Sequence, residues 1–201
     1  SETYKSFQVK KDISVIHNFV DVSRFSKKPI DAFRKAVAPN GERILIHASN
    51  FRKLKRVDDV IKIFANVLKE VPSKLMMVGD GPERHMAEEL SRELDICNHV
   101  RFLGKQEQME DIMVISDLFL LTSEYESFGL AALEAMAAGC PVVSTNAGGL
   151  GEINIQGVTG FLSNVGDVES MTQQAVQILK DDNTLQGFKE RAAAHSRKFD
   201  I

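Results

Sequence analysis

The segment from Thr122 to Ala138 carries the residue types with the clearest chemical potential in the chain. It opens as a polar turn that ends at Ser127, a residue type that caps helices because its hydroxyl accepts a free amide of the first turn. The residues from Phe128 to Ala138 are mostly strong helix formers, and Gly139 follows as a stop signal. We therefore predict a helix that begins at Phe128, with Ser127 as its cap.

The first amides of this helix, those of Phe128, Gly129 and Leu130, would have no partner inside the helix. They would lie at the positive end of the helix dipole and would attract an anion. Gly129 has no side chain, so an anion could come close to the backbone. The pattern predicts an anion site of phosphate size.

Two carboxylates flank the predicted site. Glu126 precedes the helix and Glu134 lies inside it, and eight residues along an ideal helix make ~2.2 turns, which brings both to a similar side. One interpretation is that both are solvated acids at the helix surface. The other is that they bind a ligand, and the apolar surroundings of Glu134 favour this, since a buried charge is unfavourable without a partner.

A second polar cluster runs from Asn50 to Arg56, after another apolar run and before another helical pattern. Its basic side chains could form a solvated charged face. Lys55 and Asn50, however, would meet an anion shared with the predicted helix start, because the carboxyl ends of parallel strands share one edge of a sheet.

The elements that would position these residues alternate regularly along the chain. We predict strands at 13–17, 43–49, 74–78, 100–103, 117–121, 141–144 and 159–162, and helices at 29–38, 57–70, 83–94, 109–115, 128–138, 168–179 and 185–199. This alternation predicts an α/β fold, a doubly wound parallel sheet of Rossmann-like type, with no linker dividing residues 1–201.

Composition excludes several function classes. A net charge of -3 gives no reason to expect nucleic acid or an anionic membrane as a partner. No apolar run approaches the ~20 residues of a membrane span and no signal peptide opens the chain, so we expect a cytoplasmic protein without membrane insertion. The histidines lack metal-ligand spacing, and we expect no metal site. Because residue 1 is not methionine, we expect the chain to begin inside a longer protein.

The motifs as a set are specific: Glu126-Ser-Phe-Gly-Leu with Glu134 eight residues on, Ala135 to Gly139, Pro141 to Ser144, Gly148-Gly149, Glu152 and Gly157 to Leu162. This set, the EX7E arrangement included, resembles the retaining glycosyltransferases of family 4. The resemblance covers nearly the whole chain and implies the carboxy-terminal, nucleotide-sugar-binding half of a two-domain GT-B fold. The acceptor domain would be absent from this chain.

The resemblance also implies roles. Lys55, with Asn50 where many relatives carry Arg, would hold the diphosphate opposite the amides of Phe128 to Leu130. Glu134 would bind the ribose hydroxyls, Glu126 would engage the donor sugar, and backbone groups of Arg101 would bind the base. Gly151, where Pro is common, and Cys140 depart from the family pattern.

The implied donor is UDP-N-acetylglucosamine or another nucleotide sugar, with L-malate as a candidate acceptor and no cofactor. A homo-oligomer is compatible with the pattern. The configuration of the transferred sugar could be retained in two ways: by a carboxylate nucleophile, or by same-face attack of the acceptor assisted by the leaving phosphate. We favour the second, since no residue is an obvious nucleophile. We expect the chain alone to bind without turnover. A nucleotide-sugar-binding module without activity and an effector-sensing domain remain alternatives.

Overall fold

The computed structural model describes residues 18–201, so the strand predicted at 13–17 lies outside the described part. The strands are β1 (Arg43–Ser49), β2 (Ser73–Gly79), β3 (Val100–Gly104), β4 (Leu118–Leu121), β5 (Val142–Thr145) and β6 (Gly160–Ser163). The helices are α2 (Val22–Phe25), α3 (Asp31–Val37), α4 (Val57–Leu68), α5 (Arg84–Glu93), α6 (Met109–Met113), α7 (Leu130–Ala137), α8 (Leu150–Ile153), α9 (Val168–Leu179) and α10 (Asp182–Ser196), with short 3-10 turns η1 (Lys53–Lys55), η2 (Cys97–His99) and η3 (Arg197–Phe199).

The six strands form one sheet in the order β3-β2-β1-β4-β5-β6, and every neighbouring pair is parallel. This confirms the predicted doubly wound α/β fold. The chain runs outward from β1 to β3 on one side and then crosses back to β4 on the other. The order therefore reverses between β1 and β4, which is where ligands bind in sheets of this kind.

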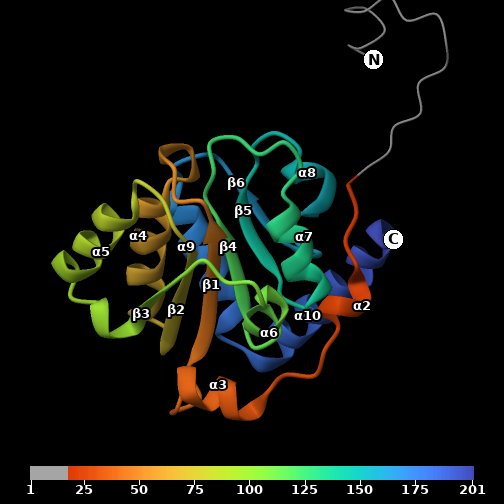
Figure 1. Cartoon of the computed structure of the whole chain (residues 1–201), viewed down its shortest axis with the longest axis horizontal. Helices are drawn as coiled ribbons and strands as arrows, with labels where there is room; N and C mark the ends of the chain where they lie inside the picture. Colours follow the sequence, from red (N-terminus) through yellow and green to blue (C-terminus); the bar gives the residue numbers. More distant parts are fainter. Residues whose placement is uncertain (1–17) are drawn as a thin grey trace, which may run out of the picture.

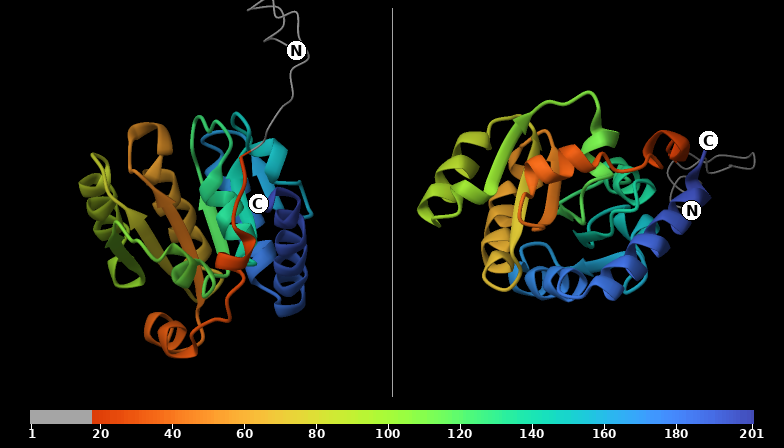
Figure 2. Two further views of the ribbon diagram at one scale, coloured as in Figure 1. Left: turned by 45° about the vertical axis from the view of Figure 1, so that its right-hand side comes forward. Right: turned by 90° about the horizontal axis from the view of Figure 1, so that it is seen from below.

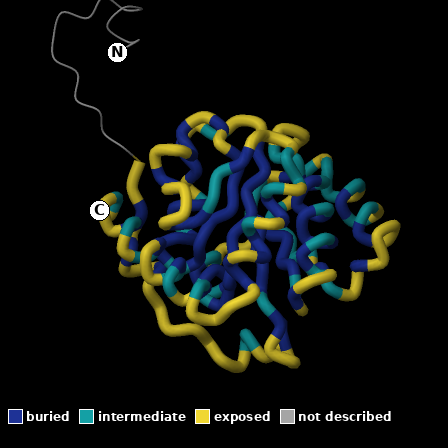
Figure 3. The backbone as a smooth tube through the Cα atoms, turned by 180° about the vertical axis from the view of Figure 1, so that it is seen from behind, coloured by how far each residue is buried: buried dark blue, intermediate teal, exposed yellow. Residues whose placement is uncertain are grey.

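Helices cover both faces of the sheet, as the two further views show (Figure 2). Side chains of β1 alternate between the two layers: Ile44 and Ile46 pack toward α6 and α7, and Leu45 packs toward α4 and α9. The four inner strands, β2, β1, β4 and β5, are buried over most of their length, while much of the connecting backbone is exposed (Figure 3). Burial on both faces explains why these strands are apolar runs rather than alternating patterns.

The two ends of the described chain meet beside α2 (Figure 1). The amide of Val20 donates to the carbonyl oxygen of Phe199 over 2.9 Å, and that of Val22 donates to Oδ1 of Asp200 over 3.0 Å. Between Asn18 and Ile201, no helix combines the length and apolarity that a bilayer span requires.

Most predicted elements are present with ends shifted by a few residues. The largest differences are the last helix, which begins at Asp182 instead of Leu185, and two short helices that were not predicted, α2 and α8. Helix α8 lies partly within the glycine turn at 148–151. Asp181 explains the early start of α10, because its carboxylate accepts the amide of Thr184 over 2.7 Å.

Candidate functional site

Most of the predicted site residues converge where the strand order reverses; the exceptions are Arg101 and Glu134. The loop after β1 leads through η1 into α4, and the loop after β4 leads into α7. Between them lies a cavity of about 310 Å³. Its lining comprises Asn18, Ala48, Ser49, Asn50, Lys55, Leu121, Glu126, Ser127, Phe128, Gly129, Leu130 and Ala131. The structure therefore shows that the two loops line one cavity, while the roles given to their residues stay predictions.

Lys55 and Glu126 both line this cavity and contact each other directly. Nζ of Lys55 donates to Oε1 of Glu126, and the hydroxyl of Ser123 donates to the same oxygen over 2.9 Å. The side chains of Lys55 and Glu126 are 17% and 14% exposed. A partly buried cation of this kind can hold a phosphate, and the carboxylate beside it can accept hydrogen bonds from hydroxyls.

The predicted start of the helix at Phe128 and the cap at Ser127 were wrong. Helix α7 begins at Leu130, its N-cap residue is Gly129 with φ 95° and ψ 47°, and no side chain caps it. A Cβ on Gly129 would lie 2.5 Å from Cδ2 of Leu150. The turn is therefore made by a glycine in the left-handed region that packs against α8, and not by a serine hydroxyl.

The later start leaves the anion-binding character of the loop in place. The amides of Phe128, Gly129, Leu130 and Ala131 donate to no acceptor within residues 18–201. All four residues line the cavity. These amides and the ammonium of Lys55 therefore supply hydrogen-bond donors from two walls of one cavity.

Glycine residues hold the loop of Glu126 from behind. A Cβ on Gly148, whose φ is 57°, would lie 1.9 Å from the carbonyl oxygen of Glu126, and one on Gly149 would lie 2.4 Å from that of Ser127. The amide of Gly149 donates to the carbonyl oxygen of Glu126 over 2.9 Å. No residue with a side chain fits at either position without moving the loop.

The loop after β1 is supported in the same way. A Cβ on Gly79 would lie 1.8 Å from the carbonyl oxygen of Ser49, and one on Gly81 would lie 2.0 Å from that of Asn50. The sequence contains the signal, a Gly-x-Gly turn directly after a strand, but the contact itself joins segments about 30 residues apart. These four glycines are site residues that the sequence prediction did not assign.

His47 does not line the cavity, but it contacts Ser49, which does, and the sequence prediction missed it. Its ring is fully buried, with Nδ1 2.9 Å from the carbonyl oxygen of Leu120 and Nε2 2.8 Å from Oγ of Ser49. Because a carbonyl only accepts, Nδ1 carries the proton and Nε2 accepts the hydroxyl of Ser49. Burial lowers the pKa of His47 to about 4, so the ring is neutral and links β1 to β4.

Glu134 lies in the helix that leaves the cavity but does not line the cavity itself. Burial raises the pKa of this carboxyl; the charge of Arg24 opposes the increase and that of Glu110 adds to it. Nη2 of Arg24 donates to Oε2 of Glu110 over 3.0 Å. Within the described chain, the carboxylate of Glu134 accepts no hydrogen bond, which leaves the carboxylate oxygens open to a ligand.

Arg101 lies apart from the cavity, on the outermost strand β3. Its exposed side chain donates from Nη2 to the carbonyl oxygen of Ala36 in α3 over 3.2 Å. Helix α3 lies at the end of the sheet opposite the loop between β1 and α4 (Figure 1). A base-binding role for the backbone of Arg101 stays a prediction. The side chain of Arg101 contacts α3 and does not line the cavity.

No group of three or more His, Cys, Asp or Glu residues within 18–201 has the arrangement of a metal site. Among residues 18–201, Glu126 is the one carboxylate that lines the cavity, and it already pairs with Lys55.

The family model described as "Glycosyl transferases group 1" matches residues 30–195. N-acetyl-alpha-D-glucosaminyl L-malate synthase of Bacillus anthracis is 44% identical over 193 residues, which cover 96% of this chain and 51% of that protein. D-inositol 3-phosphate glycosyltransferase of Corynebacterium urealyticum is 29% identical over 212 residues, covering 98% of this chain and 50% of that protein.

Among solved structures, Anabaena Alr3699/HepE in complex with UDP superimposes with a TM-score of 0.85 at 27% identity, covering 93% of this chain and 53% of that one. The structural neighbours are GT-B glycosyltransferases. The chain spans about half the length of the relatives it matches.

Proposed function

The chain belongs to the glycosyl transferases group 1 family, and from this premise we propose that it is the donor-binding half of a retaining enzyme that transfers N-acetylglucosamine from UDP-N-acetylglucosamine to L-malate. The acceptor would bind to a further domain that the described chain lacks. Turnover would require both halves, and the chain alone would bind the donor. The reaction would take place in the cytoplasm.

The observation that carries the proposal is the pairing of one cation with four open amides around a cavity of about 310 Å³ at the reversal of the strand order. Such donors match the oxygens of a diphosphate, which carries several charges within a few ångströms. The UDP in the related Anabaena structure supports a uridine nucleotide as the ligand of this cavity.

The proposed mechanism follows from the charge that develops during the reaction. When the bond between the sugar and the phosphate breaks, negative charge accumulates on the departing diphosphate. Lys55 and the amides of Phe128 to Ala131 would stabilise that charge. Glu126 would hold the sugar hydroxyls, Glu134 the ribose, and Asn50 would donate to the diphosphate.

Retention is explained by same-face attack. The acceptor hydroxyl would approach the face that the phosphate leaves, and a phosphate oxygen would take its proton. No metal is needed in this scheme because Lys55 supplies the cation. The sequence also lacks the Asp-x-Asp pair that could hold a divalent ion beside a diphosphate.

L-malate as acceptor rests on the 44% identity to the Bacillus anthracis enzyme. The residues that would bind it lie outside this chain. Transfer by the full-length protein from UDP-N-acetylglucosamine to L-malate, inositol phosphate and a sugar acceptor, each with and without EDTA, tests acceptor and mechanism together. We expect product with L-malate alone and no effect of EDTA; activity that EDTA abolishes and Mg²⁺ or Mn²⁺ restores would exclude the metal-free mechanism.

Binding to the 201-residue chain tests the donor half by itself. Calorimetry with UDP should show saturable binding, and UDP-N-acetylglucosamine should bind with similar affinity because the sugar adds few contacts in this half. GDP serves as the matched nucleotide control. The absence of heat with both nucleotides would reject the assigned site.

A further inference from the structure

Arg56 has a backbone conformation that is unfavourable for its residue type. Its φ of 47° and ψ of 52° place it in the left-handed region, between the end of η1 and the start of α4. Among residues 18–201, the non-glycine residues with positive φ are Phe51, Arg56 and Asp95. In this region Cβ approaches the following carbonyl oxygen, so something must compensate for the strain.

Helix capping does not explain the residue. Arg56 is the N-cap of α4, and its side chain makes no capping hydrogen bond. An arginine has no acceptor for the free amides of a first turn, and the residues suited to this position are Ser, Thr, Asp, Asn and Gly. The reason for an arginine must lie in what its guanidinium contacts.

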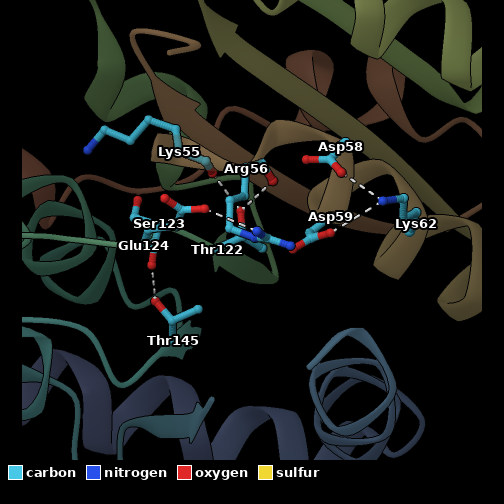
Figure 4. Close-up of polar contacts among 9 residues, drawn as sticks. All are labelled: Lys55, Arg56, Asp58, Asp59, Lys62, Thr122, Ser123, Glu124 and Thr145. Atoms are coloured by element: carbon cyan, nitrogen blue, oxygen red, sulfur yellow. Dashed lines mark hydrogen bonds and ion pairs between the residues drawn. The ribbon is translucent and has the colours of Figure 1, made fainter. Parts of the chain in front are cut away.

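The guanidinium is clamped between two carboxylates from different parts of the fold (Figure 4). Nε donates to Oδ2 of Asp59 over 2.6 Å, and Nη1 donates to Oε1 of Glu124 over 3.1 Å. The side chain of Asp59 is only 4% exposed, so its carboxylate is shielded from solvent. The ion pairs hold the strained turn and connect the start of α4 to the loop after β4.

The backbone on either side of Arg56 is fixed to that same loop. The hydroxyl of Thr122 shares its hydrogen between the carbonyl oxygens of Lys55 and Arg56, at 2.8 and 2.9 Å. The amide of Glu124 donates to the carbonyl oxygen of Leu54 over 2.8 Å. The peptide groups that flank Lys55 therefore have one orientation.

This orientation decides where Lys55 points. Figure 4 shows the Lys55 side chain extending away from the guanidinium of Arg56. Lys55 reaches the cavity and Glu126, whereas Arg56 faces Asp59 on the other side of the loop. The two side chains diverge at the point where the backbone leaves η1 and enters α4 through the left-handed residue.

We propose that Arg56 is a positioning residue of the donor site: its left-handed turn, held by Asp59 and Glu124, aims the ammonium of Lys55 at the diphosphate. The inference rests on the proposed function of the cavity. The backbone conformation does the aiming, and the ion pairs allow an arginine to adopt it.

Three variants of the 201-residue chain separate aiming from general stability. Arg56→Gly keeps the left-handed turn available and should bind UDP within about threefold of the unmodified chain. Arg56→Val, whose branched side chain opposes the turn, should weaken UDP binding at least tenfold. Asp95→Val introduces the same strain at φ 55°, far from the cavity, and should lower the melting temperature without changing UDP affinity.

A double-variant cycle measures the coupling between Arg56 and Lys55 in UDP affinity, which a purely structural role of Arg56 would leave unchanged. Lys55→Ala should weaken UDP binding in the unmodified chain and in Arg56→Gly, but should have almost no effect in Arg56→Val, where Lys55 is already misdirected. If Arg56→Val does not fold, Arg56→Ala replaces it, with the same expected loss of coupling.

Equal effects of Lys55→Ala in all backgrounds would overturn the inference, and so would an Arg56→Gly variant that binds as weakly as Arg56→Val. These results differ from a failure of the proposed function, in which the unmodified chain itself binds no UDP.

Discussion

The ammonium of Lys55 and the carboxylate of Glu126 form an ion pair that joins the loop after β1 to the loop after β4. Both side chains are mostly buried, and both line the cavity between the loops. In the proposed function the two groups have different partners, the diphosphate and the donor sugar. Binding of the donor must therefore replace at least part of the contact between Lys55 and Glu126. The ion pair thus couples diphosphate binding by the loop after β1 to sugar binding by the loop after β4.

The first prediction concerns the cation. Lys55→Ala should weaken UDP binding to the chain by roughly ten- to a hundredfold, because a hydrogen bond to a charged group contributes about 1.5 to 3 kcal/mol. Lys53→Ala is the matched control, since it removes the same charge from an exposed position of the same short turn. Calorimetry measures the UDP affinity of both variants. An equal loss of affinity in the two would show that Lys55 acts only through its overall charge and makes no specific contact with the diphosphate.

The second prediction concerns Glu126, the ion-pair partner of Lys55. Glu126→Gln removes the carboxylate that competes with the diphosphate for Lys55, so UDP should bind severalfold more tightly, while transfer by the full-length protein should fall because the sugar loses its acceptor group. Glu169→Gln, a change of the same charge at an exposed position on α9, should alter neither quantity. Weaker UDP binding in Glu126→Gln would show that this carboxylate contacts the nucleotide directly.

The sequence predicted the sheet and the meeting of its two loops because those features depend on local patterns. Apolar runs such as Ile44 to Ile46 indicate buried parallel strands, and parallel strands bring their carboxyl ends together regardless of detail. The sequence alone therefore predicts that Lys55 and Glu126 lie near each other.

The helix start at Leu130 could not be predicted in the same way. The turn at Gly129 is set by contact with Leu150 and Ile153, which are distant in sequence. A serine before a helical pattern predicts a cap from local residues alone, and here tertiary packing overrides that preference. The clamp on Arg56 has the same origin, since Glu124 is 68 residues away.

The third prediction tests the support behind the loop of Glu126. Gly148→Ala would place Cβ 1.9 Å from the carbonyl oxygen of Glu126, so the loop must move, and UDP affinity should fall at least tenfold together with the melting temperature. Gly41→Ala is the control: φ there is 78°, but nothing lies within 4 Å of the added Cβ. It should lower stability through backbone strain alone, and a matching loss of UDP affinity would contradict the role given to Gly148.

Glu134 offers a test in which stability and binding move in opposite directions. Burial raises the pKa of its carboxyl, so the folded state takes up this proton at a higher pH than the unfolded state does. The stability linked to this group is therefore present at low pH and is lost as the pH rises through the raised folded pKa. At neutral pH the charged carboxylate destabilises the fold, and the proposed reason for its presence is the ribose of the donor.

The fourth prediction is that Glu134→Gln raises the melting temperature at pH 7.5 and weakens UDP binding by roughly ten- to a hundredfold, because the amide removes the buried charge together with the charged acceptor. The gain in melting temperature over the unmodified chain should shrink as the pH is lowered toward the ordinary pKa of 4.5. Glu89→Gln, an exposed change on α5, should alter neither property. Melting curves at several pH values and calorimetry with UDP provide both readouts. If the variant is more stable and still binds UDP as tightly as before, the carboxylate of Glu134 does not bind the ribose.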